Sequence, residues 1–160
     1  MNSLTIRRAT KKDGKGFLSL IKALADFEKL KPPTFAARKR LLHDAFGKKK
    51  RFDTLLAEVH GKAIGYAIFF ETYSSFLALP TLYLEDIFVL PEYRKQKVGF
   101  QLFKECVAQA KRRGCGRMEW MVLDWNRNAI GFYDSLGTTQ LRQWLPYRLE
   151  HSNFQRILNM

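Results

Sequence analysis

Two adjacent acidic residues, Glu85 and Asp86, interrupt the otherwise apolar run at residues 81–90. In a strand, alternation places Glu85 with Tyr83 on one face and Asp86 with Leu84 and Phe88 on the other. A carboxyl group among apolar neighbours has its charged form disfavoured, so its pKa rises and it can accept a proton near neutral pH. The alternative is a carboxylate that pairs with a nearby Arg or Lys. With one acid on each face, we expect at least one of them to meet solvent or a cavity.

The stretch "EYRKQKVGFQLF" at residues 92–103 indicates a second kind of chemistry. It connects the apolar run to a helix-like pattern through four polar residues and Gly99. The unpaired N–H groups and the dipole at a helix N-terminus attract phosphate oxygens, and a glycine lets the backbone approach a ligand closely. The stretch therefore fits a phosphate cradle, and it equally fits a solvated basic loop. The local pattern leaves both interpretations open.

A scaffold must position these residues, and the remaining pattern predicts one. We expect a strand over residues 4–10, a helix capped by Thr10 or Asp13 and stopped by "KLKPP", and a second helix capped by Thr34 and ended by Gly47. The later elements are an antiparallel hairpin over 54–59 and 63–73, an apolar loop over 74–80, a strand over 81–90, a helix from Val98 to Gly114, a buried strand over 117–123, a short helix over 126–137 and one or two strands over 139–150. This order predicts an α+β fold around one central sheet. Because no linker, internal repeat or low-complexity segment is visible, we expect one domain over residues 1–160.

The composition favours an anionic partner without identifying it. The chain has 160 residues, 46% of them hydrophobic, and a formal net charge of +13. Such an excess suits nucleic acid, a membrane surface or a phosphate-rich ligand, and it equally suits plain solubility. The basic runs "KKDGK", "RKR" and "GKKKR" occur in separate places and are not interleaved with aromatic residues in the manner of a single-strand binding surface.

Several classes of protein do not fit the sequence. No segment approaches the ~20 continuous apolar residues that span a bilayer, and the N-terminus does not resemble a signal peptide. Cys106 and Cys115 lie in or beside one predicted helix, so we expect no disulfide framework and a cytoplasmic location. The three histidines are widely separated, so we expect no metal site.

Two longer stretches, "LYLEDIFVLPEYRKQKVGFQLF" and "VLDWNRNAIGFYDSLG", together resemble the GNAT superfamily of acetyl-CoA-dependent N-acetyltransferases. The branch most similar is that of the spermidine/spermine and thialysine acetyltransferases. "IKALADFEKL" and "LLHDAFG" also fall where the N-terminal helices of that branch lie, so the resemblance spans nearly the whole chain. It implies a mixed, mostly antiparallel sheet flanked by helices, and transfer of an acetyl group from acetyl-CoA to a primary amine. It also implies a homodimer with the C-terminal strands at the interface.

The resemblance assigns residues to coenzyme A. The pyrophosphate loop of the family corresponds to Arg94, Lys95, Gln96, Lys97, Val98, Gly99 and Phe100. Lys95 and Lys97 occupy two glycine places, and because lysine does not adopt positive φ cheaply, they are tolerated only if they keep ordinary helical or bridge angles. Their ammonium groups then either reinforce phosphate binding or crowd it. The other matched positions are Ile87, Phe88 and Val89, on a strand that pairs with the pantetheine arm, and Asn126 and Ala129 in the later helix. Ile87 to Val89 equally suit the core, and Asn126 equally suits a helix N-cap.

The resemblance also assigns catalytic and substrate-binding roles. Tyr133 matches the general acid that protonates the leaving thiolate, although a buried aromatic beside Phe132 is the alternative. Glu85 matches the base that deprotonates the amine, directly or through a water. Because the amine attacks the thioester directly, Cys106 is interpreted as core. The residues that match the substrate pocket are Phe27, Glu28, Glu85, Asp86, Glu119 and Asp124.

The choice of amine follows from charge. "KLKPP" is basic where the polyamine enzymes are acidic, so a long polycation is repelled and a small diamine or a lysine-like amino acid fits better. Two other functions stay open. One is acetylation of a protein lysine or N-terminal amine. The other is a basic nucleic-acid-associated module that has lost catalysis, which is consistent with the net charge. Catalysis itself requires no nucleic acid.

Overall fold

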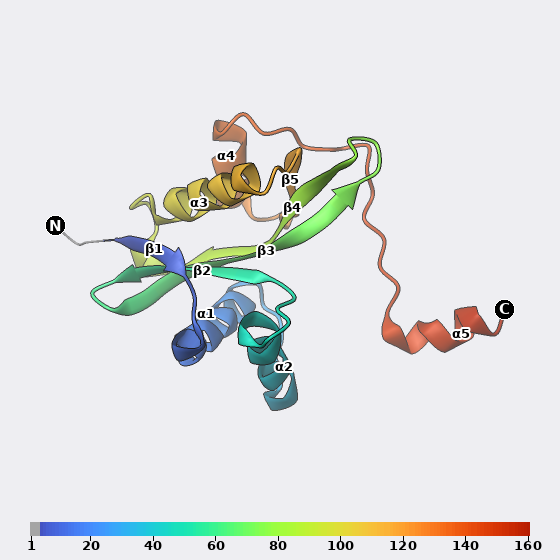
Figure 1. Cartoon of the computed structure of the whole chain (residues 1–160), viewed down its shortest axis with the longest axis horizontal. Helices are drawn as coiled ribbons and strands as arrows, with labels where there is room; N and C mark the ends of the chain where they lie inside the picture. Colours follow the sequence, from blue (N-terminus) through green and yellow to red (C-terminus); the bar gives the residue numbers. More distant parts are fainter. Residues whose placement is uncertain (1–3) are drawn as a thin grey trace. The chain divides into compact units, whose positions relative to one another are not determined.

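The computed structural model describes residues 4–160 and forms two compact units, divided after Met121. The first unit contains β1 (Thr5–Arg8), η1 (Lys11–Asp13), α1 (Gly14–Phe27), α2 (Phe35–Phe46), β2 (Asp53–Val59), β3 (Lys62–Ser74), β4 (Leu79–Val89), η2 (Pro91–Tyr93), α3 (Val98–Arg112) and β5 (Arg117–Trp120). The second contains α4 (Arg127–Ser135), η3 (His151–Asn153) and α5 (Phe154–Leu158) (Figure 1). The single-domain prediction for residues 1–160 stays a prediction.

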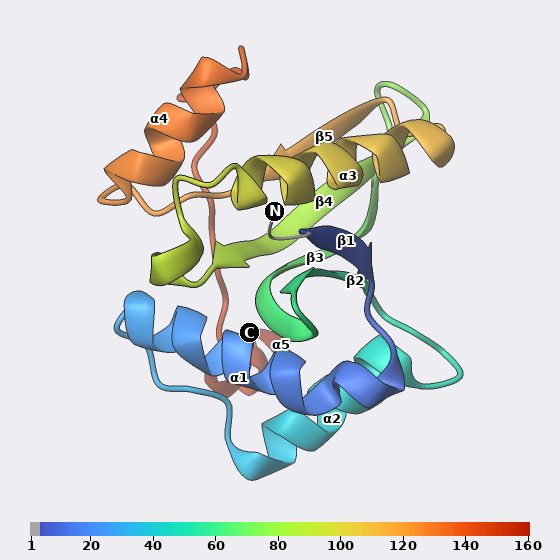
Figure 2. The ribbon, with the colours of Figure 1, turned by 90° about the vertical axis from the view of Figure 1, so that its left-hand side faces the viewer.

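One five-stranded sheet organises the first unit. Its order is β1-β2-β3-β4-β5, antiparallel throughout except for the parallel pair of β4 and β5. Helices α1 and α2 cover one face of this sheet and α3 covers the other (Figures 1 and 2). The prediction of an α+β fold with a mostly antiparallel sheet flanked by helices is therefore confirmed.

The helix boundaries follow from local chemistry. The Asp13 carboxylate accepts from the Thr10 N–H at 2.7 Å, and Asp13 is the N-cap of α1. Thr34 Oγ1 accepts from the Ala37 N–H at 3.3 Å and so caps α2, which ends at Gly47. The Thr34 side chain satisfies a first-turn donor that has no intrahelical partner, whereas Asp13 holds the N-cap position of α1 and bonds back to Thr10. The predicted caps of both helices are confirmed.

A β-bulge in β4 changes the facing of the acidic pair. Ile68 pairs with Asp86 and the next residue, Phe69, pairs with Leu84, so Glu85 is the extra residue. Directly paired residues share a face, and consecutive residues on β3 face opposite ways. Asp86 therefore lies on the face opposite to Leu84, and the prediction that the two share a face is wrong. Alternation fails here because a bulge inserts a residue without a partner.

Two predicted boundaries are also corrected. The loop expected at residues 74–80 is shorter, since β3 runs to Ser74 and β4 begins at Leu79. The strand expected at 117–123 ends at Trp120 and is only half-buried, with Met121 and Leu123 exposed. Apolar composition alone did not reveal that β5 is the last strand of the sheet, with a paired neighbour on one side only.

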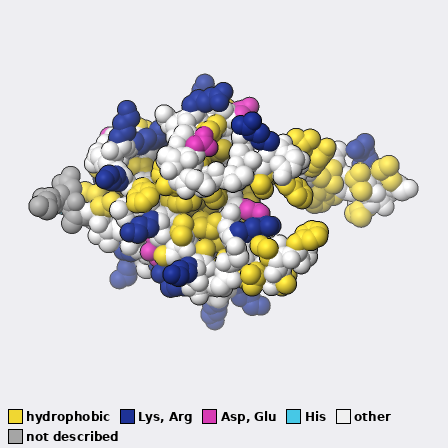
Figure 3. All heavy atoms as spheres, turned by 90° about the horizontal axis from the view of Figure 1, so that it is seen from above, with side chains coloured by type: hydrophobic (Ala, Val, Ile, Leu, Met, Phe, Trp, Pro, Cys, Tyr) yellow, Lys and Arg dark blue, Asp and Glu magenta, His cyan; other side chains and the backbone are white. Residues whose placement is uncertain are grey.

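The strands expected at residues 139–150 do not form. This segment has no strand pairing, and its apolar side chains are exposed, including Trp144, Leu145 and Tyr147. Figure 3 shows that hydrophobic side chains are prominent on the surface seen in that view. A strand needs a neighbour for its backbone groups, and Pro146 has no N–H to donate. Strand-like composition was therefore not sufficient.

Candidate active site

A cavity of about 480 Å3 lies in the first unit, on the face of the sheet covered by α1 and α2. Its lining residues are Ile21, Pro33, Leu41, Phe52, Ile68, Phe70, Glu85 and Asp86. Six of these eight residues are apolar, and the two acids are adjacent in the chain. Both carboxylates thus reach one cavity, contrary to the prediction that they face opposite ways. The bulge at Glu85 provides the reason.

Asp86 has a raised pKa. Burial raises its pKa to about 6, and the negative charges of Glu85 and Glu28 act in the same direction. The Tyr66 hydroxyl donates to Asp86 Oδ2 at 3.1 Å, which favours the charged form and opposes the rise. The prediction of a carboxyl with a raised pKa in this strand is confirmed, at Asp86.

Tyr66 is a site residue that the sequence did not indicate. It is fully buried, and it stacks edge-on against Phe17 and lies 6.3 Å from Phe88. Tyr66 pairs with Phe88 across the strands, and Ile68 pairs with Asp86, so Tyr66 and Asp86 are diagonal neighbours on one face. A correct register across the bulge was needed to find this contact, and the sequence pattern does not provide it.

The end of α1 adds Phe27 and Glu28 to the same region. Phe27 lies 6.3 Å from Phe88 between ring centroids, and the Arg94 guanidinium lies 4.6 Å above the Phe27 ring. Burial raises the pKa of Glu28. The structure therefore brings together four of the six predicted substrate residues: Phe27, Glu28, Glu85 and Asp86.

Glu119 and Asp124 are placed differently. Glu119 lies beside Tyr83 in the parallel pair of β4 and β5, and its carboxylate forms an ion pair of 2.8 Å with Arg117. This ion pair competes with any amine for Glu119. Asp124 is exposed and belongs to the second unit.

The loop before α3 has the backbone shape of a glycine loop. Lys95 has a φ of 60° and Lys97 a φ of 63°, both left-handed. The condition that these lysines keep ordinary angles is therefore not met, and lysine bears the conformational cost of the left-handed backbone. Both side chains are exposed, as is that of Gln96.

The start of α3 offers free donors to an anion. The first intrahelical bond joins the Gln101 N–H to the Lys97 carbonyl, so the N–H groups of Val98, Gly99 and Phe100 precede the helix ladder. An anion with several oxygens fits such a group of donors next to two ammonium groups. Arg94 plays a different part, because its Nε donates to the Val89 carbonyl at 3.0 Å and its guanidinium stacks on Phe27.

The second half of β4 has one open edge in the sheet. The Leu90 N–H donates to the Ile64 carbonyl of β3, so alternation directs the backbone groups of Val89 and Ile87 away from β3. In the described sheet, β5 pairs with β4 only from Thr81 to Leu84. The backbone of Ile87 and the N–H of Val89 can therefore pair with an extended ligand, while the Val89 carbonyl accepts from Arg94. The buried Phe88 side chain belongs to the core around Tyr66.

Helix α4 contains the remaining predicted residues. Asn126 Oδ1 accepts from the Ala129 N–H at 3.2 Å, which makes Asn126 the N-cap of this helix. Tyr133 is buried, and its ring lies 5.2 Å from that of Phe132. Within this unit, Asn126 is therefore a helix N-cap and Tyr133 is a buried aromatic, which are the alternatives given for them in the sequence analysis.

Three further features concern a cysteine nucleophile, a metal site and a membrane span. Cys106 is buried and burial raises its pKa to about 12, which suits a core residue. Within residues 4–160 no group of three or more acidic, His or Cys side chains could hold a metal ion. No helix among these residues is long and apolar enough to cross a membrane.

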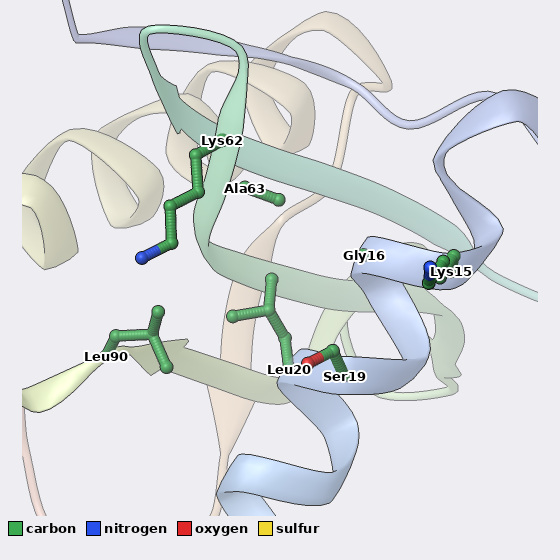
Figure 4. Close-up of a pocket in the computed structure, with 7 residues that line it drawn as sticks. All are labelled: Lys15, Gly16, Ser19, Leu20, Lys62, Ala63 and Leu90. Carbon is green, nitrogen blue, oxygen red and sulfur yellow. The ribbon is translucent and has the colours of Figure 1, made fainter.

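A second cavity, of about 330 Å3, is unsuited to a cationic amine. It is lined by Lys15, Gly16, Ser19, Leu20, Lys62, Ala63 and Leu90. Lys62 and Leu90 lie on one side of it, and Ser19 and Leu20 of α1 lie on the other (Figure 4). With two lysines and no carboxylate, this cavity repels the substrate that the acidic cavity attracts.

Comparison with known proteins decides the family. The model of the acetyltransferase (GNAT) family matches residues 20–138. The chain belongs to this family. A thialysine N-epsilon-acetyltransferase from Mus musculus is 34% identical over 161 residues, which cover 94% of each chain. An L-ornithine N5-acetyltransferase from Arabidopsis thaliana is 42% identical over 93 residues, which cover 58% of this chain and 41% of that protein.

Solved structures agree on the fold. An integron cassette protein from V. cholerae superposes with a TM-score of 0.82 at 22% identity and covers 99% of both chains. An aminoglycoside N-acetyltransferase solved with CoA has a TM-score of 0.78 at 22% identity, covering 93% of this chain and 96% of that one. The protein is a GNAT N-acetyltransferase, and enzymes of this family take the acetyl group from acetyl-CoA.

Proposed function

We propose that the protein acetylates the side-chain amine of a small diamine or a lysine-like amino acid. The observation that carries this proposal is the bulge at Glu85, which directs two adjacent carboxylates into one largely apolar cavity. Such a cavity attracts an ammonium group and accepts an alkyl chain. Relatives named for thialysine and ornithine act on amines of this size, which supports the proposal.

Glu85 is the proposed base. An alkylammonium has a pKa near ~10.4 and no lone pair, so it must lose a proton before it attacks a thioester. Glu85 is the more exposed of the two acids and takes this proton directly or through a water. Asp86 stays negatively charged above pH of about 6 and holds the amine in the cavity.

Tyr133 is the proposed acid. As the amine nitrogen bonds to the acetyl carbon and the carbon–sulfur bond breaks, the leaving sulfur gains negative charge. A phenol next to that sulfur protonates it and recovers its own proton from solvent. Tyr133 is buried, and phenols, with an ordinary pKa of ~10, carry the proton that this task requires.

The loop and strand residues suit coenzyme A. The first-turn N–H groups of α3, with Lys95 and Lys97, are proposed to bind the pyrophosphate, and the outward backbone groups of Ile87 and Val89 to bind the pantetheine arm. We propose that Asn126 and Ala129 contact the coenzyme from the start of α4. The bound coenzyme supplies an acetyl thioester.

The test is release of free thiol from acetyl-CoA in the presence of different amines. We expect turnover with thialysine, lysine, ornithine or 1,3-diaminopropane, weaker turnover with spermidine, and none with a lysine-containing peptide. Peptide turnover above that of every small amine contradicts the proposal and supports protein acetylation instead.

Two variants test the catalytic roles. Glu85→Gln is expected to lower kcat by about 100-fold or more, and Tyr133→Phe by about 10- to 100-fold. The matched controls are Glu92→Gln and Tyr147→Phe, whose side chains are exposed, and they should retain full turnover. Rates for Glu85→Gln or Tyr133→Phe equal to those of the controls would remove the corresponding role.

We also propose a domain organisation, a cellular location and an oligomeric state. Residues 1–160 form one acetyltransferase domain in the cytoplasm, and two copies associate through the C-terminal segment. The family match supports one domain because it extends across Met121, and the exposed apolar side chains of residues 141–149 support association.

A further inference from the structure

The net charge of the chain is concentrated in one layer. Residues 11–51, which form η1, α1, α2 and the loop after α2, contain thirteen Lys and Arg and four Asp and Glu, a formal excess of nine. The whole chain has an excess of thirteen, so the other 119 residues contribute only four. All thirteen cations are exposed.

The fold brings three separate basic runs together around the second half of α2. A side chain at Gly14, within the run at 11–15, would contact Leu42 at 3.2 Å. The Arg51 N–H donates to the Asp44 carbonyl, which folds the run at 48–51 back onto α2. The run at 38–40 lies one turn before Leu42. The start of α1 and the last turns of α2 are neighbours in both ribbon views (Figures 1 and 2).

The acids of this layer are already engaged. Asp13 pairs with Arg7 of β1, Asp26 with Lys22, and Asp44 with His43, while Glu28 belongs to the active-site region. Within residues 4–160, Lys22 is the one cation of the layer that has a carboxylate within 4.0 Å. The other twelve are available to an external anion.

The cations fit a nucleic acid better than a membrane. Membrane-surface helices insert an apolar face, but Leu41, Leu42, Ala45 and Phe46 of α2 pack into the protein core. Binding through the charges alone suits a duplex, whose phosphates form a dense and regular row of negative charge. The exposed Phe35, with Lys39 Nζ 4.7 Å above its ring, is a single aromatic platform and too little for single-strand binding.

We propose that the α1–α2 layer binds a nucleic-acid duplex through its phosphates, without reading the base sequence. This binding is additional to acetyl transfer and does not depend on it. The acidic cavity lies beneath the same layer, so a docked duplex places the enzyme where cationic amines accumulate as counterions.

The test measures the fluorescence anisotropy of a labelled RNA duplex of about 20 base pairs over a range of salt concentrations. The wild-type protein should bind with a Kd that rises steeply with salt and that a scrambled duplex reproduces. Replacing Lys48, Lys49 and Lys50 together by Gln should raise Kd by about 10-fold or more and reduce the slope of log Kd against log salt by about 2 to 3. Thiol release with small amines should be unchanged in this variant.

The control removes three exposed cations of α3, Lys104, Lys111 and Arg112, on the other face of the sheet (Figure 1), and so makes the same change in net charge. It should change Kd by less than about 3-fold, since these side chains lie outside the layer. Equal losses in both triple variants would overturn the proposal, because net charge alone would then explain binding. No duplex binding at low salt, or tighter binding to phosphatidylserine vesicles, would also overturn it.

Discussion

At the scale of single residues, the contact between Tyr66 and Asp86 links the core to the chemistry. Tyr66 is part of the packed cluster with Phe17 and Phe88, so its hydroxyl has a fixed position. That hydroxyl holds the carboxylate of Asp86 at the cavity. The Tyr66 hydrogen bond therefore lowers the pKa of Asp86, although Tyr66 itself need not contact the amine.

The raised pKa of Asp86 predicts a pH-dependent cost to folding. Its pKa is about 6 in the folded protein and near the ordinary 3.8 when unfolded, so the folded state binds the proton more tightly. The stabilising contribution is complete below pH of about 4 and is lost as pH rises through about 6. Asp86→Asn should therefore raise the free energy of unfolding at pH of about 7.5 by about 3 kcal/mol and change it little at pH of about 4. Urea unfolding at both pH values measures this, and an equal effect at both would contradict it.

Tyr66→Phe is expected to shift the pH dependence of catalysis. The Tyr66 hydroxyl lowers the pKa of Asp86, so its removal should raise that pKa and move the acid limb of kcat/KM for a cationic amine to higher pH. The pH profile of thiol release tests this, with Tyr147→Phe as control because its side chain is exposed. A loss of activity without a shift of the limb would indicate a structural role only.

At the scale of elements, the loop before α3 combines a strained backbone with two cations. A non-glycine residue in the left-handed region costs about 1–2 kcal/mol. Lys95→Gly and Lys97→Gly should each raise the free energy of unfolding by up to about 1 kcal/mol, part of the gain being offset by the greater freedom of glycine when unfolded. Each should also raise KM for acetyl-CoA, because an ammonium group is lost.

The matched control for the loop is Lys104→Gly, in the middle of α3. There glycine should lower the free energy of unfolding by about 1 kcal/mol and leave KM unchanged. Thermal or urea unfolding with acetyl-CoA kinetics separates the two effects. Destabilisation by glycine at 95 and 97 would show that the loop carries no strain.

Most elements could be predicted from the sequence, because caps, prolines and glycines are local signals. Thr34 and Gly47 bound α2 as expected, and Pro91 follows the end of β4. The bulge at Glu85 and the left-handed lysines could not be predicted, since each depends on pairing or closure imposed from outside the segment. The resemblance placed Glu85 and Asp86 in one substrate pocket, but strand alternation put them on opposite faces, and the Tyr66 contact was not foreseen.

At the scale of the whole molecule, the C-terminal segment predicts association. Exposed Trp144 and Leu145 lie in a stretch that forms no strand within the described chain. Replacing both by Ser should convert a dimer into a monomer, because the buried apolar area would be lost. Sedimentation velocity measures this, and Leu30→Ser, another exposed apolar site, is the control. A wild-type protein that sediments as a monomer at high concentration would contradict the prediction.

The unpartnered residue in β4 also bears on how the activity could disappear during evolution. Phe69 pairs with Leu84 and Ile68 with Asp86, so losing the codon for Glu85 would make these pairs consecutive and leave every core side chain in place. A one-codon deletion elsewhere in β4 would shift the pairing register by one residue and turn the core-facing side chains on one side of the deletion to the other face of the sheet. The fold thus does not require Glu85, the residue proposed to remove the proton, so a one-codon deletion could abolish that proposed role while the fold is kept.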